Sequence, residues 1–262
     1  DLFIAGFIPG VMLAVGLMAM NYFISRRKKY EGDGKKLSAK LVVVTMKEGF
    51  WALLTPVIIL GGIYTGFFTP TEAAIVSIFY TLFVGIFIYK EIELSGVMKA
   101  LESTTWITGR VLIIMFTALA FGQLLTLNNI PDLIAQGLLN LTSNIYMIWA
   151  LIIIFLLFMG MFMETLATIM LVTPVLLPVM VSLGVDPIHF GVVLVCCCEI
   201  GFATPPLGEN MFIASGVARA TLEEISVNAL PFVFVSVFVV FLIAYLPGLT
   251  LWLPNLLNSI FG

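Results

Sequence analysis

The segment from Ile145 to Leu183, IYMIWALIIIFLLFMGMFMETLATIMLVTPVLLPVMVSL, is almost continuously apolar and carries no basic residue. A membrane-spanning helix needs roughly 20 apolar residues, so the segment offers more than one span. Gly160 and Glu164 interrupt it near its middle. Two interpretations are open: two full spans, or a re-entrant hairpin whose half-helices meet at 160–165 and return to the same side. In both, the backbone is helical because lipid offers it no hydrogen-bond partners.

Composition extends this prediction to the whole chain. Of its 262 residues, 61% are hydrophobic and 10% are charged, whereas soluble domains have roughly 45–50% and about 25%. The apolar runs are continuous, which excludes the alternating strands of about 10 residues that build an outer-membrane barrel. The sequence has no basic domain that would bind nucleic acid, and its net charge is −3. We therefore expect an all-α polytopic membrane protein surrounded by the lipid bilayer.

Basic residues set the expected orientation of the spans. Most of them lie in the loop 25–50, which the positive-inside rule places in the cytoplasm. Residues 37–50 form either an amphipathic surface helix or an extension of the next span. Four further basic residues are expected on the cytoplasmic side: Lys90, Lys99, Arg110 and Arg219. Besides 145–183 and 188–217, we expect spans at about 2–24, 51–67, 73–89, 111–127 and 230–246, an interfacial segment at 91–105 and a short outer helix at 132–141.

The apolar segment 188–217 is broken at Gly201–Asn210, GFATPPLGEN. Proline suits the first turn of a helix and threonine is a fair N-cap. We therefore expect one helix to end near Gly201 and another to start at Pro205 with Thr204 as its cap. Helix ends leave carbonyl and N–H groups without partners, and secondary transporters use such breaks to hold Na⁺ and a carboxylate. A proline kink repaired by neighbouring helices is the other interpretation.

The break at Gly160 repeats this pattern. Glu164 and Thr165 lie where the second half-helix would begin, and an acid there complements the positive end of the helix dipole. A carboxylate in hydrocarbon needs compensation, so Glu164 should either cap this helix or face a wet cavity near an ion. Of these two roles we predict the cap, with a weak contribution to the ion site. An ordinary apolar turn between two spans is the other interpretation of this break.

Other polar residues have simpler interpretations. Glu72 follows a Thr-Pro-Thr turn and complements a helix dipole. Cys196, Cys197 and Cys198 are consecutive in an apolar run, which is typical of small buried residues and not of a metal site. His189, at an outer helix start, is predicted to be interfacial, not a proton relay. A membrane enzyme would need a nucleophile with a base and a channel a polar pore face; we see neither pattern and expect no enzyme.

Four motifs lie in order along the chain: Gly61–Ala74 (GGIYTGFFTPTEAA), Ile169–Pro178 (IMLVTPVLLP), Leu183–Gly191 (LGVDPIHFG) and Thr204–Gly208 (TPPLG). Together they resemble the large membrane subunit of TRAP transporters, the DctM-like family. The likeness extends from Phe3 to Pro254 and so covers nearly the whole chain.

The resemblance implies a sodium-coupled secondary transporter of the bacterial cytoplasmic (inner) membrane. Members of the family take up organic acids, such as a C4-dicarboxylate or sialic acid, with an extracytoplasmic substrate-binding protein and a small membrane subunit. The chain would be the second inverted repeat of an elevator-type carrier, without most of the first repeat. Scaffold helices would occupy 1–143, the hairpin and broken helix of the transport domain 144–220, and a last span with an outer tail 221–262. A binding-protein-independent sodium/dicarboxylate symporter of related architecture is the alternative.

By position in the family, the hairpin tip is 160–165 and the broken-helix loop is 201–206. We predict that both loops contribute oxygens to a sodium site, while the start of the second half-helix faces a substrate carboxylate. The predicted sodium residues are Gly160, Glu164, Thr165, Gly201, Thr204 and Pro206. The predicted substrate residues are Thr204, Pro205, Glu209 and Asn210.

Overall fold

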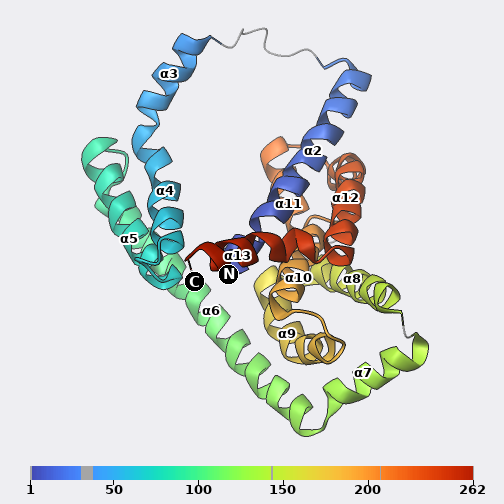
Figure 1. Ribbon diagram of the computed structural model, residues 1–262. Helices are drawn as coiled ribbons and strands as arrows, with labels where there is room; N and C mark the ends of the chain where they lie inside the picture. The colour runs from blue at the N-terminus through green and yellow to red at the C-terminus, as the bar shows by residue number, and fades with distance from the viewer. Residues whose placement is uncertain (1, 31–37, 143, 207, 262) are drawn as a thin grey trace. The chain divides into compact units, whose positions relative to one another are not determined.

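The computed structural model describes residues 2–30, 38–142, 144–206 and 208–261. Every secondary-structure element in these ranges is a helix, as predicted (Figure 1). In chain order they are α1 (Leu2–Ala5), α2 (Phe7–Lys28), α3 (Ala39–Glu48), α4 (Phe50–Tyr64), α5 (Pro70–Phe83), the π-helical turn η1 (Val84–Ile88), α6 (Leu94–Leu127), α7 (Ile130–Leu141), α8 (Ile145–Phe162), α9 (Thr165–Ser182), α10 (Pro187–Phe202), α11 (Glu209–Ala218), α12 (Leu222–Tyr245) and α13 (Gly248–Phe261).

Within the described ranges, six helices are long and apolar enough to cross a membrane. They are Leu2–Lys28, Pro70–Ile88, Leu94–Leu127, Ile145–Phe162, Thr165–Ser182 and Leu222–Tyr245. This confirms the polytopic all-α membrane protein. The arms α8 and α9 each have 18 residues, enough for a full crossing, so two spans and a long-armed hairpin remain as alternative predictions for 145–183.

The structure differs from the prediction in α6 and at the junction of α3 and α4. The expected interfacial segment 91–105 and span 111–127 lie mostly in one continuous helix, α6, of 34 residues. A bend of 69° separates α3 from α4, so 37–50 is not a straight extension of the following span. Part of the predicted basic loop falls on 31–37, which lies outside the described residues.

The chain divides into two compact units, one formed by Asp1–Tyr30 with Arg110–Gly262 and the other by Glu31–Gly109. In the smaller unit α4 packs against α5, and the Tyr80 hydroxyl donates a hydrogen bond to the Trp51 carbonyl at 2.7 Å. Thr69 and Glu72 form a reciprocal capping box at the start of α5, which confirms the predicted role of Glu72. The functional division at residues 143 and 220 concerns which parts move, and it stays a prediction.

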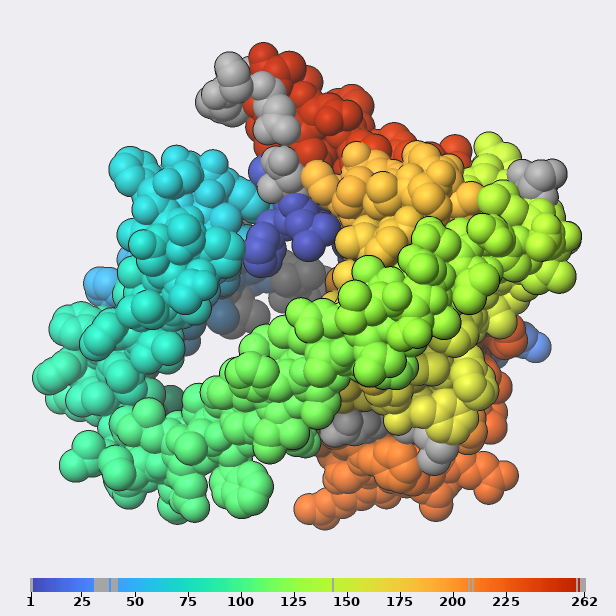
Figure 2. Space-filling model, turned by 90° about the horizontal axis from the view of Figure 1, so that it is seen from below, coloured from blue at the N-terminus to red at the C-terminus, as the bar shows by residue number. Residues whose placement is uncertain are grey.

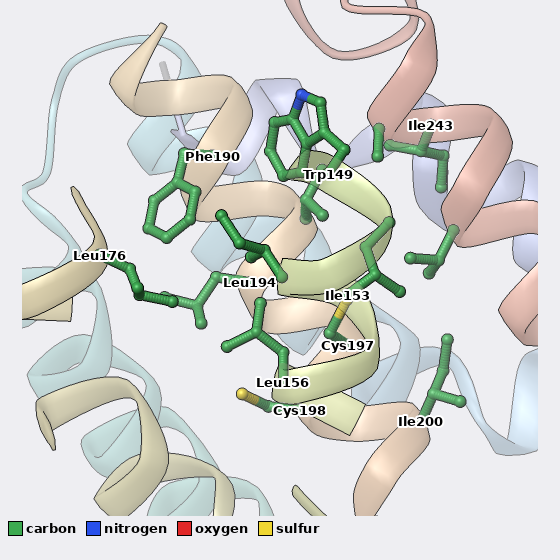
Figure 3. Packing of buried hydrophobic residues seen from close by; sticks show 14 of the residues in the cluster. Trp149, Ile153, Leu156, Leu176, Phe190, Leu194, Cys197, Cys198, Ile200 and Ile243 are labelled. Carbon is green, nitrogen blue, oxygen red and sulfur yellow. The ribbon is translucent and has the colours of Figure 1, made fainter. Parts of the chain in front are cut away.

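In the larger unit, α10 lies at the centre of the hydrophobic core. It packs against α8, α9, α12 and α13, and its side chains Phe190 and Leu194 face those of α8 (Figure 3). Cys197 and Cys198 are fully buried in this core and Cys196 is half-buried, all three as free thiols. The structure therefore confirms that the three cysteines are packing residues of a buried helix.

Candidate ion and substrate site

The helices α8 and α9 are the two arms of the segment 145–183, and the break between them, the tip in the hairpin interpretation, is short. α8 ends at Phe162, Met163 is extended, and Glu164 is the N-cap of α9. The carbonyl of Glu164 accepts hydrogen bonds from the backbone N–H of Thr168 at 3.0 Å and from its hydroxyl at 3.1 Å. The predicted position of this break, and the start of the second helix at Thr165, are thus confirmed.

The carboxylate of Glu164 does not cap α9, which corrects the prediction for its side chain. It makes no capping hydrogen bond to the backbone and instead pairs with Arg110 on α6, with Nη2 3.3 Å from Oε2. The Glu164 side chain is 38% exposed and the Arg110 side chain 60% exposed. A guanidinium compensates a carboxylate charge directly, whereas a cap gives it only partial charges. Arg110 therefore neutralises the acid next to the hairpin tip.

The second break lies between α10 and α11. α10 ends at Phe202, close to the predicted end at Gly201, but α11 begins at Glu209 with Gly208 as its N-cap. The prediction of a helix start at Pro205 capped by Thr204 is therefore wrong. Thr204 instead acts on the helix before it.

Thr204 satisfies the carbonyl end of α10. Its hydroxyl donates to the Ile200 carbonyl at 2.5 Å, and its backbone N–H donates to the Gly201 carbonyl at 2.8 Å. The last carbonyls of a helix have no partner within the helix, and a threonine hydroxyl readily bonds a carbonyl four residues earlier. Thr204 therefore makes this bond and does not act as an N-cap. The oxygen of its hydroxyl can still accept a hydrogen bond or bind a cation.

The loop folds back so that Gly208 lies against carbonyl oxygens. A Cβ at Gly208 would lie 2.5 Å from the Phe202 oxygen and 2.8 Å from the Thr204 oxygen. The backbone N–H of Gly208 donates to that Thr204 oxygen at 3.1 Å. Only glycine fits here without displacing backbone. The loop thereby gathers backbone oxygens, which are the ligands that hard cations prefer.

Two glycines bring both breaks together. A Cβ on Gly160 of α8 would lie 3.1 Å from the Cα of Gly201 on α10, and a Cβ on Gly201 would lie 2.7 Å from the Leu157 carbonyl oxygen. The two helices therefore touch backbone to backbone, one turn or less before each break. The two breaks therefore lie next to each other.

Two threonine hydroxyls on α9 are buried without a partner in the described part of the chain, and the sequence predicted a role for one of them. Within the described residues, the side-chain oxygens of Thr165 and Thr173 on α9 are buried and have no hydrogen-bond partner. A buried polar group without a partner is destabilising by about 1–3 kcal/mol, and a missing ion is one explanation for it. Thr165 adjoins the hairpin break and was predicted. Thr173 was not assigned, because threonine within an apolar run signals nothing by itself.

A model of the family described as tripartite ATP-independent periplasmic transporter, DctM component, matches residues 1–249. The chain belongs to this DctM family. It is 38% identical to the isethionate TRAP transporter permease protein DctMQ of Oleidesulfovibrio alaskensis, over 96% of this chain and 40% of that protein. It is also 38% identical to the sialic acid TRAP transporter large permease protein SiaM of Vibrio cholerae, over 97% of this chain and 60% of SiaM.

A third relative is the C4-dicarboxylate TRAP transporter large permease protein DctM of Pseudomonas aeruginosa, which is 38% identical over 98% of this chain and 60% of that protein. The chain thus spans between 40% and 60% of the length of these relatives. The family and the six apolar helices together make it a multi-pass protein of the bacterial inner membrane, as predicted. These relatives are named as permeases.

The remaining site residues of this DctM-family chain lie around the second break. Pro205 is half-buried, Pro206 and Asn210 are exposed, and the side chain of Glu209 lies outside the described residues. Within those residues, no three His, Cys, Asp or Glu side chains are grouped as a metal site.

His189 lies in the first turn of α10, at the predicted helix start, and its ring is buried within the protein. The ring is 1% exposed, lies against Trp149 and joins α10 to the corner between α12 and α13. Its Nδ1 is 2.8 Å from the Thr250 hydroxyl oxygen, and its Nε2 is 3.1 Å from the Ala244 carbonyl oxygen. A neutral ring that donates from Nε2 to the Ala244 carbonyl can accept at Nδ1 from the Thr250 hydroxyl, whose single proton also has the Pro247 carbonyl oxygen within reach at 2.9 Å. His189 is therefore a buried structural link.

Proposed function

We propose that this chain belongs to the large membrane subunit of a sodium-coupled permease that imports an organic acid delivered by an extracytoplasmic binding protein. The DctM-family match over residues 1–249 carries the proposal. The relatives' names specify isethionate, sialic acid and C4-dicarboxylates, and all three are small organic anions. The chemistry they share is a negative charge, which is carboxylate in two of them. A C4-dicarboxylate or sialic acid is our proposed substrate, and a small membrane subunit the second proposed partner.

The sodium part of the proposal rests on the two adjoining breaks. Backbone oxygens gather at Phe202 and Thr204 around Gly208, and the Thr165 hydroxyl is buried without a partner among the described residues. These atoms fit an oxygen-liganded monovalent cation, which would supply positive charge for a nearby anion. We keep Gly160 and Gly201 in the site as the residues that allow the two breaks to touch.

The substrate part of the proposal uses the start of α11. This helix begins at Glu209, and its first backbone N–H groups and positive dipole end favour a carboxylate. Pro205 and Asn210 lie on either side of this helix start. Because Arg110 compensates Glu164, the acid at the hairpin tip opposes an incoming anion less than a free carboxylate would. In this proposal the transport domain, residues 144–220, moves across the membrane relative to the scaffold helices in residues 1–143 and carries the ion and the substrate with it.

Uptake into proteoliposomes tests the proposal. The carrier containing this chain, its small subunit and its binding protein would be supplied with labelled substrate, with and without an inward sodium gradient. We expect uptake to require both the gradient and the binding protein. Uptake of free substrate without the binding protein would support a binding-protein-independent symporter instead.

Threonine-to-valine variants test the ion ligands in the same assay. Thr204→Val and Thr165→Val keep the side-chain volume and lose the oxygen, so each should lower the apparent sodium affinity about tenfold, on the order of 1.4 kcal/mol. Thr117→Val is the matched control, because the Thr117 hydroxyl bonds only carbonyls of its own helix, at 2.9 Å. Unchanged sodium dependence in Thr204→Val and Thr165→Val would remove these two residues from the site.

A further inference from the structure

A cavity of about 470 Å³ lies between the two arms of the hairpin and α7. Every side chain that lines it is apolar, including Phe155 of α8, Val175 of α9, Ile134 and Leu138 of α7, and Phe121 of α6. No residue of the two breaks belongs to its lining. The cavity is therefore separate from the candidate ion and substrate site.

The packing of the helices explains why this space exists. Both arms pack against α10 but contact each other little, so they diverge and leave a gap between them. The helix α7 packs against α9, beside which it lies in Figure 2. Leu138 of α7 also packs against the buried core cluster. The cavity is thus enclosed on three sides by α7, α8 and α9, unlike the open outer face of a single helix.

The lining decides what can fill the cavity. A buried water needs two to four polar partners, and an apolar cavity of about 150 Å³ stays dry and binds a molecule such as benzene. The cavity here is about three times that size and offers no polar side chain. Its volume falls within the roughly 300–1,000 Å³ of ligand pockets. The matching ligand is a flexible hydrocarbon.

The surroundings decide which hydrocarbon it is. Leu151 and Phe155 on the wall of the cavity are 42% and 45% exposed, and they belong to a helix that is long and apolar enough to cross a membrane. Lipid acyl chains are the abundant hydrocarbon there. Since no charged side chain lines the opening, a chain is recognised by its apolar contacts and not by a headgroup. We propose that this cavity binds one acyl chain of a membrane phospholipid, held between α7 and the hairpin arms.

Photolabelling in vesicles tests this proposal and does not depend on transport. The protein would be reconstituted in phosphatidylcholine containing a diazirine near the end of one acyl chain, irradiated, and mapped by mass spectrometry. We expect labels to concentrate on 151–159 of α8 and 171–176 of α9. Label spread evenly over all lipid-facing helices, as when another part of the protein covers the cavity, would overturn the proposal.

Two phenylalanine variants on α9 sharpen the test. Val175→Phe fills the cavity from its wall and should lower labelling of 151–159 at least fivefold. Val181→Phe is the matched control, because Val181 is 45% exposed and lies outside the lining; it should leave labelling unchanged. If Val175→Phe fails to fold, Leu171→Phe offers a second filling variant. Equal labelling of 151–159 in Val175→Phe and Val181→Phe would refute the site. If free palmitate displaces the label and no phospholipid is enriched at the cavity, the ligand is a fatty acid and the phospholipid proposal is wrong.

Discussion

Replacing Gly201 by alanine tests the contact on which the candidate site depends. The added Cβ would lie 2.7 Å from the Leu157 carbonyl oxygen, 2.8 Å from the Gly160 Cα and 2.9 Å from the Gly160 carbonyl carbon. All three are backbone atoms of α8, so no side-chain rotation relieves the overlap. Restoring an ordinary contact of 3.4 Å from 2.7 Å requires a displacement of about 0.7 Å between α8 and α10.

The expected loss of stability follows from this displacement. Forcing extra volume into a packed interior is destabilising by typically 1–3 kcal/mol. Gly216 in α11 provides the matched control, because a Cβ there meets nothing within 4 Å. Both glycines are helical, so the gain of about 0.5–1 kcal/mol from replacing glycine in a helix is common to both variants. The difference between Gly201→Ala and Gly216→Ala should therefore be about 1–3 kcal/mol.

Unfolding in mixed micelles, followed by circular dichroism at rising dodecyl sulfate fraction, measures this difference. We expect Gly216→Ala to unfold at or above the midpoint of the unaltered protein and Gly201→Ala clearly below it. The sodium dependence of uptake should also weaken in Gly201→Ala only, since the two breaks move apart. Midpoints that agree for the two variants would show that α8 and α10 do not touch at these glycines.

Two further predictions use the same unfolding measurement. In a double-mutant cycle of Arg110→Gln and Glu164→Gln, we expect a coupling of about 0.2–1 kcal/mol that falls with salt, because both side chains are more than a third exposed; strictly additive effects would mean that the pair does not form. His189→Phe keeps a ring but removes both polar contacts, so we expect a loss of about 1–3 kcal/mol, and a smaller loss for Thr250→Val. A His189→Phe protein as stable as the original would contradict the role of the ring as a link.

The positions of the breaks could be predicted because their signals are local. Gly160 and Glu164 interrupt an apolar run, and the Gly201–Gly208 segment concentrates residues that end helices. The start of α11 at Glu209 could not be predicted from such local signals. Two prolines suit the first turn of a helix, but the Thr204 hydroxyl is used by the preceding helix. The outcome depends on which of two local hydrogen bonds forms, and composition does not decide between them.

The partner of Glu164 and the burial of His189 were beyond sequence reasoning for another reason. Arg110 precedes Glu164 by 54 positions and Thr250 follows His189 by 61. No periodicity or spacing within one chain reports such contacts, which arise only when separate helices pack. The prediction that the charge of Glu164 must be compensated is correct. The predicted partner was the start of α9, whereas the actual partner is the guanidinium of Arg110 on α6.

The length of α6 gives a scale for depth in the bilayer. At 1.5 Å per residue its 34 residues measure about 51 Å, against a hydrocarbon thickness of roughly 30 Å. Even at a tilt of about 40°, the upper end of the usual range, roughly two turns must emerge into the headgroups or water. The end that carries Lys99 and Glu102 suits that region. With Leu127 at the opposite edge, Arg110 lies about 26 Å away along the axis. The Arg110–Glu164 pair would then lie in the half of the bilayer nearer the Lys99 end of α6, from where a long arginine side chain can extend toward the headgroups.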